Sequence, residues 1–169
     1  DNVTIDNVQL NGNHNHISGI SLGETNQRIT NGIVRNVTVF NHDANDPPND
    51  TGIGFKAQNS QITYTNVTSY SNLKGLDNGQ QGTTDFTIMY KVINSAFYNN
   101  GYSGISMNNK GGNFDETTYP VKYYIVNNII RDNGKYGIEH YAGPYLSYIV
   151  HNIIDNNAQY GIDCGETSP

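Results

Sequence analysis

Six polar residues each follow a repeated pair of residues, a glycine and then an apolar residue. The pairs begin at Gly19, Gly54, Gly75, Gly104, Gly137 and Gly161, and the residues that follow them are Ser21, Lys56, Asp77, Ser106, Glu139 and Asp163. Alternation along an extended strand places the apolar residue inside and its successor outside. If the six copies stack, their successors form one outward column, which is either a solvated face or a strip that binds substrate.

Two carboxylates occupy neighbouring positions of this column. Glu139 and Asp163 belong to successive copies, and stacked strands lie ~4.8 Å apart. Carboxyl groups at about 5 Å suit a retaining glycosidase or a hard cation that prefers oxygen ligands, and an ordinary acidic surface is the alternative. Tyr141 follows closely in the segment EHYAGPY. Its ring is of the kind that stacks on sugars.

Lys56 lies in the segment TGIGFKAQ, in a chain that has only nine lysine and arginine residues. Asp77 takes the equivalent position in the next copy, where a salt bridge between the two side chains is easily formed. An adjacent anion favours the charged ammonium over the neutral amine. A role for Lys56 as a base therefore requires Asp77 to be engaged by a cation or by substrate.

The elements that must position this column are short strands of a repeat. A leading asparagine followed by alternating residues recurs at positions 7, 36, 66, 94, 128 and 152. No segment has sustained helical periodicity, and one unit is too short to bury its own apolar face. The sequence predicts an all-β fold, a right-handed parallel β-helix of about six coils. We expect residues 1–169 to form a single β-helix domain, within a longer solenoid or stacked with partners.

The recurrent asparagine is predicted to form a ladder whose side-chain amides bond from coil to coil, with Asn36 and Asn66 among its members. Two insertions, residues 42–50 and 109–120, are expected on one face, where solenoid loops border binding grooves. The first supplies a candidate Ca²⁺ loop without the ligand order of an EF-hand, consisting of Asp43, Asp46 and Asp50. Neither end shows a capping pattern, so exposed strand edges are expected to favour end-to-end self-association.

Composition excludes several classes of function. Only 14% of the residues are charged, which argues against a disordered polyampholyte. The net charge of −6 and the lack of a basic run argue against binding to nucleic acid. No apolar stretch approaches the roughly 18 residues that a membrane span needs.

The segment from Asn41 to Asn100 contains NHDANDPPNDTGIGFKAQ, NVTSYSNLKGLDNG and the start of NSAFYNNG. It resembles the β-helix polysaccharide lyases of the pectate lyase 9 type, which share a GFK segment and an N-x-x-A-x-NNG coil. The likeness covers about a third of the chain. In that family the lysine of GFK removes the proton α to the uronate carboxylate, and the matching position is Lys56. The family's calcium cluster, DDGWD-like, precedes it by a coil, where residues 17–24 contain no aspartate.

The leading hypothesis is an extracellular β-helix that engages an acidic polysaccharide, with β-elimination by Lys56 as the candidate reaction. A cation, for which Ca²⁺ is the candidate cofactor, or Arg35 would screen the substrate carboxylate. The residues expected to contact substrate are Asp77, Ser106, Glu139, Tyr141 and Asp163. The rival is a non-catalytic structural or adhesive β-helix, such as a filament subunit, adhesin or phage spike segment. A glycosidase that uses Glu139 and Asp163 ranks third.

Overall fold

The computed structural model describes residues 2–14, 18–23, 28–42, 52–81, 87–110, 121–141 and 145–165. All regular elements in these ranges are β-strands, and they form two sheets. We call the ten-stranded sheet A and the six-stranded sheet B. The described residues include no helix that is long and apolar enough to cross a membrane.

Sheet A has two rows of strands that share two long strands at one end. The long strands are β1 (Asn2–Asn11) and β3 (Asn31–Phe40). One row continues with β5 (Gln61–Thr65), β8 (Ile88–Ile93), β11 (Val121–Val126) and β14 (Tyr145–Val150). The other continues with β6 (Thr68–Tyr70), β9 (Ala96–Tyr98), β12 (Ile129–Arg131) and β15 (Ile153–Asp155). The first half of β3 pairs with β5 and its second half with β6.

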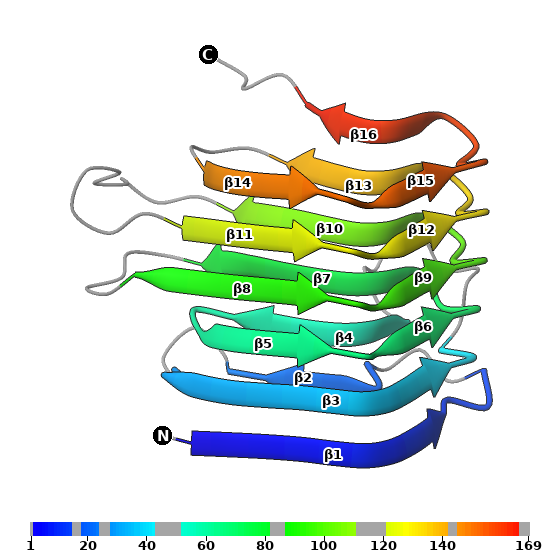
Figure 1. Cartoon of the computed structure of the whole chain (residues 1–169). Coiled ribbons are helices and arrows are strands. Elements are labelled where there is room, and N and C mark those ends of the chain that lie inside the picture. Colours follow the sequence, from blue (N-terminus) through cyan, green and yellow to red (C-terminus); the bar gives the residue numbers. More distant parts are fainter. Residues whose placement is uncertain are drawn as a thin grey trace.

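Sheet B closes the third side of each coil. Its strands are β2 (Ile20–Leu22), β4 (Ile53–Gln58), β7 (Lys74–Gln81), β10 (Ser103–Lys110), β13 (Tyr136–Tyr141) and β16 (Tyr160–Cys164). Neighbouring strands are parallel. In Figure 1 sheet A runs from left to right in front and sheet B returns behind it as the chain ascends, which is the right-handed sense. The predicted β-helix of six coils is confirmed.

The glycine–apolar pattern marks true columns of sheet B. The apolar residues pair in register from coil to coil, and so do the polar residues that follow them. Phe55, Leu76, Ile105 and Ile138 are fully buried in the core, which places their successors on the outer face. The predicted column from Ser21 to Asp163 therefore exists with the predicted membership.

Tyrosines of sheet A cross the interior and bond to the backbone and side chains of sheet B. Tyr64, Tyr90 and Tyr123 are essentially free of solvent. The Tyr64 hydroxyl donates to Asn78 Oδ1 at 3.1 Å and the Tyr123 hydroxyl donates to the Asn78 carbonyl at 2.9 Å. The Tyr90 hydroxyl donates to the carbonyl of Gly79 at 2.9 Å. Burial raises the pKa of the Tyr64 hydroxyl, which therefore stays protonated as a donor.

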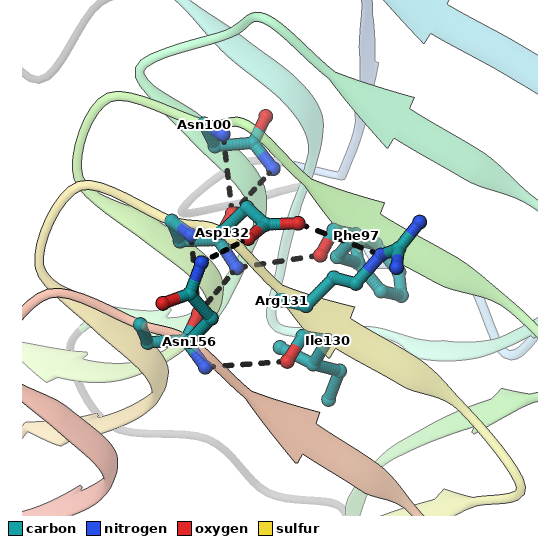
Figure 2. Close-up of polar contacts among 8 residues, drawn as sticks. Phe97, Asn100, Ile130, Arg131, Asp132 and Asn156 are labelled. Atoms are coloured by element: carbon teal, nitrogen blue, oxygen red, sulfur yellow. Dashed lines mark hydrogen bonds and ion pairs between the residues drawn. The ribbon is translucent and has the colours of Figure 1, made fainter.

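A buried asparagine ladder follows the second row of sheet A. The backbone N–H of Asn72 donates to Asn100 Oδ1 at 3.2 Å, and that of Asn100 donates to Asn133 Oδ1 at 3.1 Å. Asn100 Nδ2 also donates to Asn133 Oδ1 at 3.0 Å, and Asn133 repeats both bonds to Asn157. Figure 2 shows this ladder around Asn100. Each amide thus satisfies a backbone donor of the neighbouring coil.

Two leading asparagines of the sequence repeat lie in an exposed turn column. Asn36 and Asn66 are exposed and have positive φ angles of 54° and 53°, a left-handed conformation that asparagine tolerates better than most residues. Their amides bond along the stack, Asn36 Nδ2 to Asp6 Oδ1 at 3.0 Å and Asn66 Nδ2 to Asn36 Oδ1 at 3.4 Å. The predicted bonding of Asn36 and Asn66 from coil to coil is confirmed, and it lies outside the buried ladder because both side chains are exposed.

The last two leading asparagines belong to the next column. Asn127, not Asn128, follows Asn94 in the turn, since the N–H of Asn94 bonds to the carbonyl of Val126. Asn128 faces inward and accepts from the backbone N–H of Ser95 at 2.9 Å. Asn152 accepts from Asn128 in the same way at 2.9 Å. The asparagine repeat in the sequence therefore combines members of two columns, one in an exposed turn and one that is buried.

The glycine column exists because the ladder packs directly against it. A Cβ atom on Gly104 would lie 2.9 Å from Asn133 Nδ2 and 2.8 Å from the carbonyl oxygen of Gly137. Real Cβ atoms essentially never approach other atoms so closely. The glycine column and the buried ladder from Asn72 to Asn157 are therefore two sides of one contact.

Asn100→Ala removes a buried amide that makes bonds to the two neighbouring coils. The backbone N–H of Asn72 loses its acceptor, and the carbonyl of Ser69 loses a donor at 3.2 Å. We expect the free energy of unfolding to fall by about 3 kcal/mol, because buried groups without partners cost about 1–3 kcal/mol each. Chemical denaturation followed by circular dichroism measures the change. The exposed Asn31→Ala serves as control, and an equal loss in both variants would contradict a special role for the ladder.

Candidate functional site

The three central residues of the outer column of sheet B are nearly inaccessible to solvent. Asp77 is 8% exposed, Ser106 1% and Glu139 7%. We call these residues, which lie in register on β7, β10 and β13, the central triplet. At the ends of the column Ser21 is exposed, and Lys56 and Asp163 are half-buried. A solvated face does not explain the central triplet, because carboxylates are rarely buried without partners.

Each member of the central triplet has a buried polar atom without a regular hydrogen bond. These atoms are Asp77 Oδ1, Ser106 Oγ and Glu139 Oε2, and none finds a partner in the part of the chain that the structure describes. More than nine in ten buried polar groups in native proteins do have one. Three of the eight such atoms among the described residues lie in consecutive coils of this one column, which makes it a candidate binding site.

Two lysines and two tyrosines lie on the same side of sheet B as the central triplet. Lys74 is 5% exposed, and its Nζ lies 5.6 Å from the centroid of the Tyr102 ring. Lys135 Nζ donates a hydrogen bond to the Tyr102 hydroxyl at 3.0 Å, and it lies 4.6 Å from the centroid of the Tyr136 ring. The hydroxyls of Tyr136 and Tyr102 raise the pKa of Lys135. Two cationic side chains are thus held beside the carboxylates.

The electrostatic surroundings of Glu139 favour its protonated form. Burial is the main cause that raises the pKa of the Glu139 carboxyl, and the negative charge of Asp77 acts in the same direction. The positive charge of Lys74 opposes the shift, as does the Ser106 hydroxyl, which faces the carboxyl without a regular hydrogen bond. Glu139 therefore holds a proton at a higher pH than an ordinary glutamate does, as a general acid must.

Lys56 takes the place that the repeat predicted for it, on β4 in register with Asp77. The expected salt bridge is not formed, since no ion pair between described residues joins the two side chains. Arg35 lies on β3 in sheet A, where its guanidinium forms an exposed ion pair with Asp6 at 2.8 Å. The structure therefore does not bring Arg35 together with Lys56.

Several predicted residues lie beyond the described side chains. The backbone of Tyr141 belongs to β13 and pairs with Asn108, but its side chain is outside the described part. Asp43, Asp46 and Asp50 lie outside the described residues altogether. Within the described ranges, no three histidine, cysteine, aspartate or glutamate side chains form a group that could hold a metal ion.

Residue patterns did not single out Lys74 and Lys135. Lys74 stands just before a glycine–apolar pair in the segment KGLD, and Lys135 stands two residues before one in KYGIE, whereas only the residue after each pair was considered. The glycine column interrupts strict alternation: Gly75 and Leu76 both face the interior, so Lys74 emerges on the same outer face as Asp77. The column that contains Lys74 also holds Ile53, Ser103, Tyr136 and Tyr160, so no repeated polar pattern marked it.

Comparisons with protein-family models, with curated protein sequences and with solved structures gave no match. The resemblance to pectate lyase 9-type enzymes stays a prediction.

Ser106→Ala tests whether the buried hydroxyl lacks a partner. We expect the free energy of unfolding to rise by about 1 kcal/mol, because the variant no longer buries an unpaired hydroxyl. Ser69→Ala is the matched control, since the Ser69 hydroxyl is equally buried but donates to the carbonyl of Gly75 at 2.8 Å. That variant should lose about 1–3 kcal/mol. Equal destabilisation of both variants, measured by chemical denaturation, would refute the assignment.

Glu139→Gln tests the raised pKa through the pH dependence of stability. The folded chain binds the Glu139 proton more tightly than the unfolded chain, whose pKa is close to the ordinary 4.5. This contribution to stability is complete below pH 4.5 and is lost as the pH rises through the folded-state pKa. The free energy of unfolding of the wild type, minus that of the variant, should therefore fall between acidic and neutral pH. Urea titrations across this range measure it, and a rising difference would contradict the raised pKa.

Proposed function

We propose that the outer face of sheet B binds an acidic polysaccharide. The observation that supports this proposal is the central triplet, with a buried and unpartnered polar atom in each of three consecutive coils. Such a site loses stability when it is empty and recovers hydrogen bonds when a polar ligand enters. A polymer of this kind belongs to the cell exterior, so an extracellular or cell-surface location is part of the proposal.

The chemistry of the face suits a polymer that carries both hydroxyl and carboxylate groups. Asp77 and Glu139 accept hydrogen bonds from hydroxyls, while Lys56, Lys74 and Lys135 attract anions. The column repeats its backbone positions every ~4.8 Å, so one extended ligand can contact several coils. A charged mixture of this kind discriminates against apolar ligands, which could not satisfy the buried carboxylates.

Lys56 is the candidate base for β-elimination at this face. Its amine would take the proton α to the uronate carboxylate, the C–H electron pair would form the double bond, and the glycosidic oxygen would leave. The lack of an ion pair with Asp77 supports this role, because a salt bridge would hold Lys56 in its charged form. Lys74, which shares the face, is better placed than Arg35 to screen the substrate carboxylate. Ca²⁺ remains the candidate cofactor for the same task.

Lys56→Ala tests the lyase chemistry. On polygalacturonate or alginate, with and without Ca²⁺, we expect the wild type to form unsaturated uronate ends that absorb ultraviolet light. The variant should lose at least about a hundredfold in rate, the contribution typical of a positioned base. Lys122→Ala is the control, since Lys122 is a half-buried lysine on β11 of sheet A. Equal rates for wild type and Lys56→Ala would rule out this base.

Binding is measured separately from reaction. Isothermal titration calorimetry with polygalacturonate should show an affinity that weakens as salt rises, because exposed charges are screened. A neutral xylan should bind more weakly. Failure of every uronate polymer to bind would overturn the proposed function itself.

A structural role is the second candidate, supported by apolar side chains at one end of the solenoid. Large apolar residues of β14, β15 and β16 are 42–60% exposed, namely Leu146, Tyr148, Val150, Ile153, Tyr160 and Ile162. A second copy, or further coils of a longer solenoid, stacked on this coil would cover them and extend the column. Sedimentation velocity at increasing concentration should then show end-to-end oligomers, and Ile162→Asp should abolish them. A strictly monomeric wild type would dismiss this role.

A further inference from the structure

We propose that Asp77 and Glu139 form the base and acid of an inverting glycoside hydrolase. This inference rests on the proposed binding of a glycan to the outer face of sheet B. It assigns to that face a hydrolytic reaction in which Lys56 is not the base.

The separation of the two carboxylates is set by the coil spacing. Asp77 on β7 and Glu139 on β13 both pair in register with Ser106 on β10, so their backbones lie two strand spacings apart, about 9–10 Å. Inverting glycosidases place their carboxyl groups about 6.5–9.5 Å apart, whereas retaining ones need about 5–5.5 Å. By this backbone spacing the pair two coils apart suits the inverting arrangement, whereas the backbones of the adjacent pair Glu139 and Asp163 are one strand spacing of about 5 Å apart and suit the retaining one.

The surroundings distinguish the two roles. Burial and the nearby negative charge of Asp77 raise the pKa of the Glu139 carboxyl. Glu139 therefore suits the role of the general acid. Asp77 stands in register with Lys56, whose ammonium supplies positive charge beside a carboxylate that must act as base. Ser106 lies between them with an unpartnered hydroxyl. This hydroxyl is placed to hold the attacking water or a sugar hydroxyl.

The reaction balances with water as the only co-substrate. The water oxygen forms a bond to the anomeric carbon while Asp77 takes one water proton. The bond between the anomeric carbon and the glycosidic oxygen breaks, and Glu139 gives its proton to that oxygen. The products are a new reducing end of inverted configuration and a free hydroxyl. Exchange with solvent returns the proton to Glu139 and removes it from Asp77.

The test uses the full chain with polygalacturonate, alginate and neutral xylan. We expect new reducing ends without unsaturated products, and proton NMR of the first products should show inversion at the anomeric carbon. Asp77→Asn and Glu139→Gln should each lower the rate at least about a hundredfold while the glycan still binds. Asp155→Asn, on the exposed β15 of sheet A, is the matched control and should keep the wild-type rate.

The possible outcomes separate this inference from the proposed function. A glycan that binds without release of reducing ends overturns the hydrolase and leaves the binding function intact. Retained anomeric configuration overturns the assigned pair, and unsaturated products that depend on Lys56 overturn hydrolysis in favour of elimination. Because the stereochemical result comes from the wild type, it decides the question even if a variant fails to fold. Circular dichroism of each variant verifies its fold.

Discussion

The hydrogen bond from a backbone N–H to the asparagine Oδ1 of the neighbouring coil is the interaction on which the rest of the structure depends. It recurs from Asn72 to Asn157 in one column and from Ser95 to Asn152 in another. Because the donor is part of the main chain, each bond sets the position of one coil against the next. The main chain at these turns would otherwise carry unpaired buried donors.

The same ladder explains the glycines and, through them, the site. Its amides come so close to the glycine column that a Cβ has no room at Gly104. At that column two successive residues face inward, so the polar residues on both sides of the pair emerge on one outer face. Lys74 and Asp77 share that face for this reason. The ladder thus brings Lys74 onto the face of Asp77, although an inward-facing pair separates the two residues.

The central triplet is buried at a cost that the core must offset. Interior hydrogen bonds of Tyr64, Tyr90 and Tyr123 tie sheet A to sheet B beneath the outer face. These bonds leave the backbone of β7 little freedom, which suits a site that must hold two carboxylates at a constant separation. Unpaired polar atoms at a site, held by a bonded framework, are a usual balance between function and stability.

Much of this arrangement could be predicted from residue patterns alone. The column from Ser21 to Asp163 follows from strict alternation after an apolar residue, and it holds because that part of sheet B is regular. The buried ladder could not be located, because Asn94 and Asn128 look alike in sequence while one occupies a left-handed turn and the other faces inward. Lys74 was missed because the glycine column breaks alternation at the position that it flanks, and Lys135 was missed because it stands one residue further from its glycine.

The sequence by itself determined the parallel β-helix, its six coils and the membership of the outer column, because apolar periodicity and stacking decide these without reference to distant contacts. Only the tertiary structure decided which of those side chains are buried, which lack partners, and that Arg35 pairs with Asp6 on sheet A, away from the outer column of sheet B. Burial and pairing depend on what the whole chain places around a residue. That is why the central triplet, and not Lys56 alone, emerged as the centre of the site.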